Sequence, residues 1–150
     1  MKLSLERDIL FLLYDVARLM RTRADQRARR HGMTRAQWVI LSWLERQSGI
    51  SQNDLAGLVE VEPITVCRLI DRLEARGLVE RRSDPRDRRV RRLHLTPKAQ
   101  PILDEIHGYR EEMRKQLTAG ISKEALDTQI ESLLQMKANL AQQPGAAQAS

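Results

Sequence analysis

The segment from residue 51 to residue 96 constrains the fold most, because its hydrophobic pattern changes period within a few residues. Up to Gly77 the apolar side chains recur every three or four residues, which predicts helices. From Leu78 the pattern is extended, and two short segments, 78–82 and 90–95, flank a turn-rich stretch of charged residues. We therefore expect helices followed directly by a two-stranded hairpin with a long loop.

The helical part of this segment divides into a short helix and a longer one. Ser51 is suited to cap the short helix, and Pro63 stands where proline is tolerated, at the first position of the longer helix. Apolar residues at positions i, i+3, i+4 and i+7 give the longer helix one buried face: Val66, Leu69, Ile70 and Leu73. A short helix joined by a tight turn to a second helix is the helix-turn-helix unit.

Further amphipathic helices are predicted on both sides of this unit. One runs from about residue 5 to residue 30, and another starts at Thr34, which has capping-box spacing to Gln37. After the hairpin, Thr96 followed by a proline predicts the cap of a further helix, and Ser122 caps the last one. The expected fold class is mainly α with a small β-hairpin, arranged as a winged helix-turn-helix.

Composition narrows the class of protein further. A chain of 150 residues can form one domain with a sizeable core, and an aromatic content of only 3% suits helix packing. No apolar run approaches the ~20 residues that span a bilayer, and no export signal is readable. The single cysteine, Cys67, and three scattered histidines predict a cytoplasmic protein without disulfide, metal or cofactor. No glycine-rich phosphate loop or nucleophile elbow is present, so an enzyme is not expected.

The net charge of +6 is concentrated in one short segment. Residues 76–92 hold eight arginines against Glu80, Asp84 and Asp87, which leaves a local charge of +5. A second basic run, 21–30, holds five arginines against one aspartate. Concentrated arginine on a short loop favours phosphate contact, because each neutralised phosphate releases condensed counterions. A solvated surface without a partner is the alternative.

One face of the longer helix carries a polar stripe: Thr65, Arg68, Arg72 and Arg76. Thr65 and Arg68 lie in the first two turns, which is the part of a recognition helix that meets base edges. Arg68 has the donors to pair bidentately with guanine, and Thr65 suits a thymine methyl or a phosphate. An ordinary solvent-facing surface is the alternative for these positions.

Three polar residues at the start of the short helix are candidate phosphate ligands: Ser51, Gln52 and Asn53. Free backbone amides at a helix N-terminus add to such contacts. For Ser51 a plain capping role is the alternative, and the two roles are compatible.

Residues 51–96 resemble the MarR family of bacterial regulators, within it most of all the SlyA-like branch. The resemblance rests on the run LIDRLEARGL at 69–78 and on a hairpin that carries Asp87-Arg-Arg89 and ends in Leu95-Thr96. The flanking helices match in order and length, so the likeness covers almost the whole chain except the tail. It implies an obligate homodimer that binds a pseudo-palindromic site in double-stranded DNA, commonly as a repressor. The protein would then be cytoplasmic and associated with the nucleoid.

The resemblance also implies the division of the chain. An N-terminal dimerisation helix is expected at 1–33, a winged helix-turn-helix lobe at 34–96 and C-terminal dimerisation helices at 97–141. The small, polar tail, 142–150, has the composition of a disordered segment.

Residue by residue, the resemblance implies a recognition helix at 63–76 in the major groove and a wing at 83–89 in the minor groove. Arg88 and Arg89 match wing-tip positions, Asp87 matches an acid that orients a wing arginine, and Arg86 adds charge without a strict counterpart. Minor-groove arginine suits A·T-rich sequence, where the groove is narrow. The full predicted DNA-binding set is Ser51, Gln52, Asn53, Thr65, Arg68, Arg72, Arg86, Asp87, Arg88 and Arg89.

A small aromatic or phenolic effector is also implied by the resemblance. Arg18, Arg21, Thr34 and Trp38 match positions that line its site. The alternative is that Trp38 is core and both arginines are surface. Cys67 lacks a resolving partner in the chain, which disfavours redox sensing.

The alternative function is a non-specific architectural or RNA-binding protein that uses the same charge. The scarcity of aromatics disfavours a stacking platform for single strands. Sequence-specific binding requires that the Thr65/Arg68 surface and the arginine-rich loop face the same way.

Overall fold

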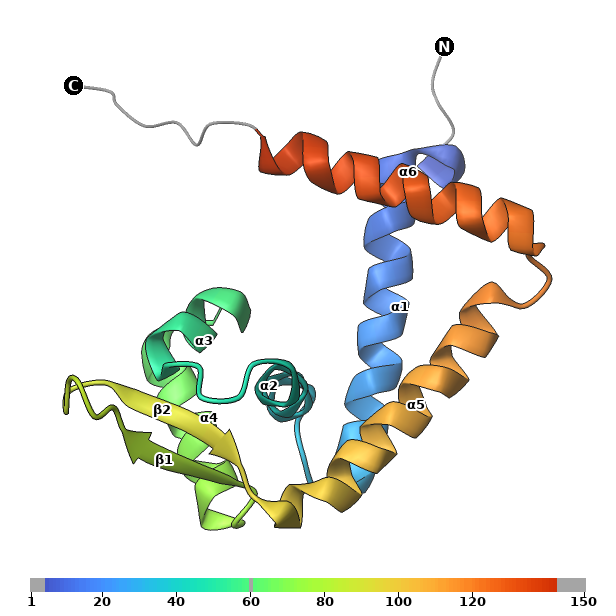
Figure 1. Cartoon of the computed structure of the whole chain (residues 1–150). Helices are drawn as coiled ribbons and strands as arrows, with labels where there is room; N and C mark the ends of the chain where they lie inside the picture. The colour runs from blue at the N-terminus through green and yellow to red at the C-terminus, as the bar shows by residue number, and fades with distance from the viewer. Residues whose placement is uncertain (1–4, 60, 143–150) are drawn as a thin grey trace, which may run out of the picture. The chain divides into compact units, whose positions relative to one another are not determined.

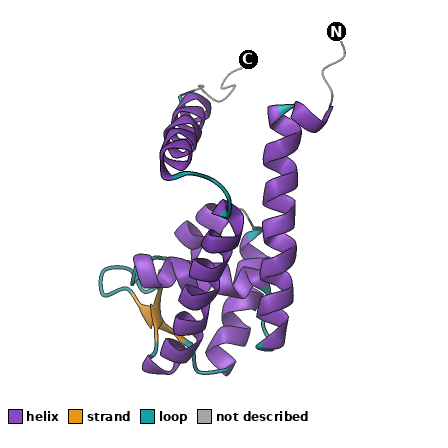
Figure 2. Ribbon diagram, turned by 90° about the vertical axis from the view of Figure 1, so that its right-hand side faces the viewer, coloured by secondary structure: helices purple, strands orange, loops and turns teal. Residues whose placement is uncertain are grey.

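The computed structural model describes residues 5–59 and 61–142, most of which are helical (Figures 1 and 2). In chain order the elements are η1 (Leu5–Arg7), α1 (Ile9–Arg30), α2 (Arg35–Arg46), α3 (Gln52–Val59), α4 (Pro63–Ala75), β1 (Val79–Ser83), β2 (Arg91–Leu95), η2 (Pro97–Ala99), α5 (Gln100–Thr118) and α6 (Lys123–Ala141). This is the predicted fold class, mainly α with one β-hairpin. Apart from residue 142, the predicted tail lies outside the described residues.

Local side-chain caps start the helices where the sequence places polar residues. The Asp8 carboxylate accepts hydrogen bonds from the backbone N–H groups of Leu10 and Phe11 at the start of α1. At α2 the predicted capping box is present, because the Thr34 hydroxyl accepts from the Gln37 N–H and the Gln37 side chain accepts from the Thr34 N–H. Such caps satisfy amides that have no partner within the helix.

The start of α5 differs from the prediction in part. Thr96 stands at the predicted N-cap position with Pro97 after it, but its side chain makes no capping hydrogen bond. Its hydroxyl instead donates to the carbonyl of Gly77, and its N–H donates to the carbonyl of Leu78 at 3.0 Å. Thr96 therefore extends the hairpin by one rung, and its side chain is committed to the turn after α4. A 3-10 turn at Pro97–Ala99 follows, and α5 begins only at Gln100.

The hydrophobic core lies among α2, α3, α4 and the hairpin. Among the described residues, all buried hydrophobic side chains fall between Ala28 and Ile106. The predicted stripe of α4 is buried as expected: Val66, Leu69, Ile70 and Leu73. Helix α2 packs against α3, α4 and β2, so the short helix and the longer helix are held by a common support.

The hairpin alternates between a face toward the core and a face toward solvent. β1 and β2 pair antiparallel, with Val79 opposite Leu95 and Arg81 opposite Leu93. Val79 and Leu93 are buried, and period-two alternation places Arg81 on the same face of the sheet. An arginine is thereby directed toward α4 rather than toward solvent.

Contacts within the chain form two compact units, Met1–Glu111 and Glu112–Ser150. The first unit contains the whole core and the hairpin. In the second unit, α6 has no buried residue, and Ser122 caps it by accepting from the Ala125 N–H at 3.2 Å.

Candidate nucleic-acid interface

Helix α4 presents a polar face away from the core. Pro63 occupies its first turn, and no side chain caps it, so its first backbone amides have no side-chain partner. Thr65, Arg68 and Arg72 are exposed on the outward face. Among the described residues neither Arg68 nor Arg72 has a hydrogen-bond or ion-pair partner within the chain, so both guanidinium groups are free to meet a ligand.

The fourth member of the predicted stripe is engaged within the protein. The Arg76 guanidinium donates to the carbonyls of Gly32 (3.2 Å) and His31 (3.5 Å). It donates to carbonyls just beyond the C-terminal end of α1, so part of its donor set is used within the protein. The other three members of the stripe, Thr65, Arg68 and Arg72, remain open.

The N-terminal end of α3 places its three polar residues in different situations. The Ser51 hydroxyl accepts from the Asp54 N–H at 3.1 Å, so it caps the helix. The Gln52 side-chain oxygen accepts from Arg81 at 3.1 Å, and Asn53 is exposed. The backbone of Ser51 also bridges to Arg92, which ties the start of α3 to the hairpin.

The loop between the strands is closed by its own hydrogen bonds. The Asp84 N–H donates to the Val90 carbonyl, and the Val90 N–H donates to the Asp87 carbonyl. The Asp84 carboxylate accepts from the backbone N–H of Arg86 at 2.7 Å and from the Arg92 guanidinium at 2.5 Å. The backbone hydrogen bond from Arg86 and then the bond from Arg92 hold the pKa of Asp84 below its usual range. The loop is therefore a defined projection.

Asp87 contacts the backbone of the loop rather than a guanidinium. Its carboxylate accepts from the Arg89 N–H at 3.0 Å. Such a bond shapes the turn from which Arg89 projects. That an arginine side chain is also oriented by Asp87 stays a prediction.

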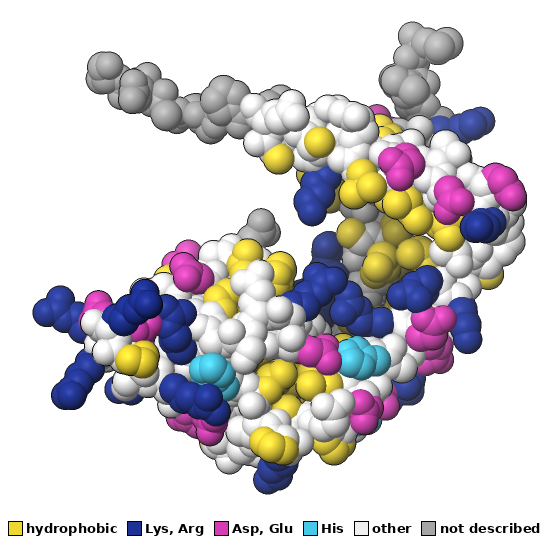
Figure 3. Space-filling model, viewed as in Figure 1, with side chains coloured by type: hydrophobic (Ala, Val, Ile, Leu, Met, Phe, Trp, Pro, Cys, Tyr) yellow, Lys and Arg dark blue, Asp and Glu magenta, His cyan; other side chains and the backbone are white. Residues whose placement is uncertain are grey.

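Most of the arginines counted in the basic segment are paired inside the protein. Of the eight between residues 76 and 92, five contact neighbouring groups: Arg76, Arg81, Arg82, Arg91 and Arg92. The other three are exposed and have no side-chain partner among the described residues: Arg86, Arg88 and Arg89. In Figure 3, Lys and Arg side chains gather at the hairpin end of the first unit. The structure thus distinguishes arginines that are paired within the protein from arginines that are free to bind a partner. A count of arginines in the sequence cannot make this distinction.

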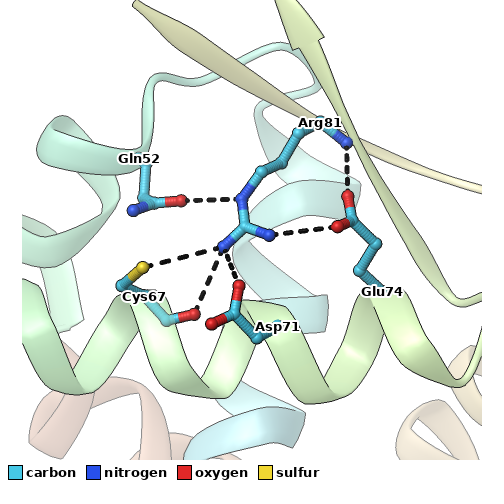
Figure 4. Close-up of polar contacts among 5 residues, drawn as sticks. All are labelled: Gln52, Cys67, Asp71, Glu74 and Arg81. Atoms are coloured by element: carbon cyan, nitrogen blue, oxygen red, sulfur yellow. Dashed lines mark hydrogen bonds and ion pairs between the residues drawn. The ribbon is translucent and has the colours of Figure 1, made fainter.

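The sequence analysis did not identify Arg81, the arginine of β1 whose side chain links the hairpin to α3 and α4 (Figure 4). Its side chain, 16% exposed, contacts Asp71 at 2.6 Å, Glu74 at 3.1 Å and the Cys67 carbonyl at 3.2 Å. Burial by itself lowers the pKa of the Arg81 guanidinium, but hydrogen bonds and attraction from Asp71 and Glu74 outweigh it, so the pKa is raised. The sequence did contain a signal: Arg81 stands two residues after Val79 in a strand, so alternation predicts that both side chains face the core. These contacts join α3, α4 and the hairpin in one unit.

The four residues predicted to line an effector site have separate surroundings. Trp38 is 4% exposed, and its ring contacts His31 and Tyr109 at centroid distances of 6.0 and 5.7 Å. Arg18 pairs with Asp15 on its own helix. Thr34, as described above, caps α2, and Arg21 is exposed. In the described part of the chain no hydrogen bond or ion pair joins either arginine to Trp38.

The indole of Trp38 has one unusual property. Its Nε1 is buried and has no acceptor among the described residues. Buried polar groups are normally hydrogen-bonded, so an isolated donor of this kind is uncommon.

The described residues offer neither a metal site nor a membrane span. No cluster of His, Cys, Asp or Glu there is arranged to hold a metal ion. None of the helices in residues 5–59 and 61–142 has both the length and the apolarity to cross a membrane.

Comparison with known proteins places these features in a family. The sequence profile of the MarR family matches residues 33–90. The chain is similar to the transcriptional regulator PA3341, with 34% identity over 87% of this chain and 96% of that one, at a TM-score of 0.77. It is also similar to the transcriptional regulator SlyA, with 25% identity over 89% and 94% of the two chains and a TM-score of 0.78.

A third similar structure is a complex of Staphylococcus aureus MepR with DNA. It shares 26% identity over 91% of this chain and 99% of that chain, at a TM-score of 0.76. The matches span almost the full length of these proteins. The chain belongs to the MarR family of transcriptional regulators.

Proposed function

We propose that this protein is a homodimeric regulator that binds a pseudo-palindromic site in double-stranded DNA. Members of its family regulate transcription and are not enzymes. In this proposal α4 lies in the major groove and the loop at 83–89 lies in the minor groove. Repression is the expected mode, and binding to DNA would place the protein in the cytoplasm at the nucleoid.

The main support for this proposal is a set of exposed arginines without a partner in the protein. In α4 and the loop, five exposed arginines have no side-chain partner among the described residues, namely Arg68 and Arg72 on α4 and Arg86, Arg88 and Arg89 in the loop. The other five arginines of residues 76–92 all have one. Holding an arginine side chain in one geometry costs conformational entropy. The loop is closed by its own hydrogen bonds, yet its arginines have no acidic partner among the described residues. Phosphates and base edges supply the missing acceptors.

Exposed apolar side chains support the dimer. On α1 nine large apolar or aromatic side chains between Ile9 and Met20 are exposed, with Leu12 and Leu13 at 48% and 41% exposure. On α6, Leu133 and Leu134 are 48% and 54% exposed. Clusters of exposed apolar side chains on a helix mark interaction sites, which supports an interface at α1 and α6. A second copy of the chain is the partner we propose for both helices.

The test is selection of binding sites from a pool of random duplexes, followed by fluorescence anisotropy on the selected duplex, its single strands and matching RNA. We expect an inverted repeat whose half-sites lie about one helical turn apart, bound by two chains per duplex. The dissociation constant should be roughly 10⁻⁸ to 10⁻¹¹ M at physiological salt. Equal binding to all duplexes would favour the architectural alternative, and a monomer at micromolar concentration would contradict the dimer.

We further propose that a small aromatic acid or phenol modulates this binding. The buried Trp38 Nε1 supports the proposal because it lacks an acceptor that a carboxylate or phenolic oxygen can provide. The nearby rings of His31 and Tyr109 suit an aromatic body.

Benzoate and phenol are the probes for the effector. Either compound is expected to weaken binding to the selected duplex severalfold, and Trp38→Phe, which removes the donor but keeps an aromatic ring, should reduce that effect. An unchanged duplex affinity at millimolar concentrations of both compounds would count against the effector. An equal response in Trp38→Phe would exclude Trp38 as its donor.

A further inference from the structure

The side chain of Arg81 contacts four residues on two helices. Its Nε donates to Gln52 on α3, and its terminal nitrogens meet Asp71, Glu74 and the Cys67 carbonyl on α4 (Figure 4). Its backbone N–H also donates to Glu74, at 3.2 Å. With its side chain 16% exposed and its donors occupied, Arg81 is not placed to bind DNA itself.

Arg81 pairs with both acidic residues of α4. Asp71 and Glu74 are the acidic residues of that helix, and their side chains are 59% and 44% exposed. Left unpaired, both carboxylates would present negative charge beside the surface that we propose to face DNA phosphates. Arg81 offsets part of that charge from within the protein.

Asp71 is also placed in sequence so that its carboxylate could form an ion pair with Arg68. The two residues are three positions apart on one helix, where acids and bases form ion pairs. Arg68 nevertheless has no partner among the described residues, and the Asp71 carboxylate is instead 2.6 Å from Arg81. The contact with Arg81 thus leaves the guanidinium of Arg68 free.

The contact with Gln52 has a similar consequence. Arginine has donors and no acceptor, so it binds the oxygen of the Gln52 amide. The amide NH₂ of Gln52 then keeps its own donors at the N-terminal end of α3, where a phosphate oxygen can accept them.

We propose that Arg81 is a positioning residue for DNA binding, which withholds Asp71 and Glu74 from the recognition surface and so keeps Arg68 free to bind. This inference rests on the proposed function. It assigns to an arginine that touches no DNA a share of the affinity, exerted through Arg68 and Gln52.

The test is a mutant cycle measured on the selected duplex. Arg81→Met should weaken binding by about tenfold, the lower end of what loss of one arginine–base contact costs. Adding Asp71→Asn and Glu74→Gln should restore affinity to within about threefold of wild type, whereas the same pair in the wild-type background should change it by less than about threefold. Arg110→Met, an exposed arginine on α5, is the matched background in which the pair should have only its wild-type effect.

Two results would overturn the inference. One is wild-type affinity in Arg81→Met; the other is a folded Arg81→Met protein whose weak binding the two neutral substitutions fail to restore, since a purely structural staple behaves in that way. Arg81→Lys keeps a positive charge between the acids and covers the case in which Arg81→Met does not fold. It should bind nearly as wild type, and tenfold weaker binding by a folded Arg81→Lys would contradict the charge role. Failure of the proposed function differs from all of these, because wild type itself would then select no duplex sequence.

Discussion

Replacing Arg88 and Arg89 together by alanine is expected to weaken binding to the selected duplex by about a hundredfold at physiological salt. Each arginine contact contributes roughly 1–3 kcal/mol, and neither side chain has a partner that its loss would leave unpaired. To the extent that the two contacts neutralise phosphates, the plot of log affinity against log salt should lose a slope of about 2. Anisotropy titrations at several salt concentrations measure both quantities.

The control for the wing variant is the same loss of charge elsewhere. Arg110→Ala together with Arg46→Ala removes two exposed arginines that lie outside α4 and the loop. Their loss should change affinity only through net charge, by a few-fold. Unchanged affinity in the Arg88/Arg89 variant at moderate salt would remove the loop from the interface.

Replacing Ile70 by alanine is expected to lower the free energy of unfolding by about 2–5 kcal/mol. Ile70 is fully buried on the face of α4 that packs into the core, so its loss leaves a cavity among well-packed neighbours. Because a domain of this size is stable by only roughly 5–15 kcal/mol, the variant loses a large share of its stability. Urea denaturation followed by circular dichroism measures the change, at one protein concentration because dimerisation also contributes.

The same helix supplies the matched control for this variant. Ile64 is 61% exposed in the first turn of α4, so Ile64→Ala should shift stability by no more than about 0.5 kcal/mol. Equal destabilisation by the two substitutions would contradict the orientation of α4 and with it the outward direction of Thr65 and Arg68. The pair therefore tests the geometry of the interface without DNA.

Much of the fold was predictable because it is encoded in short stretches of sequence. The Thr34–Gln37 box, the proline at the start of α4 and the stripe from Val66 to Leu73 each depend on residues less than two turns apart, and the structure confirms all three. The strand bounds were within one residue. Thr96 occupies the predicted N-cap position, but its side chain does not cap, because the hydroxyl has a competing acceptor, the Gly77 carbonyl, that lies nineteen positions away in sequence.

The candidate interface was predictable only as a set of positions. Arg68 was proposed from its place on a helix face, and Arg88 and Arg89 from the resemblance to the MarR family. All three are among the arginines that have no side-chain partner in the described residues. The role of Asp84 was not foreseen; in sequence it counted only as an opposing charge, and in the structure it pairs with Arg92 and closes the loop. That pairing depends on the register of the hairpin, which places the two ends of the loop side by side.

The sequence by itself determined the order and type of the elements and the amount of charge near the hairpin, because periodicity, caps and composition are local properties. Tertiary structure decided which of those charges are available. Strand alternation directs Arg81 inward to Asp71, Glu74 and Gln52, and chain geometry directs Arg76 to the end of α1. A guanidinium group has a limited set of N–H donors. Whether those donors bind acceptors inside the protein depends on groups that only folding brings close to them.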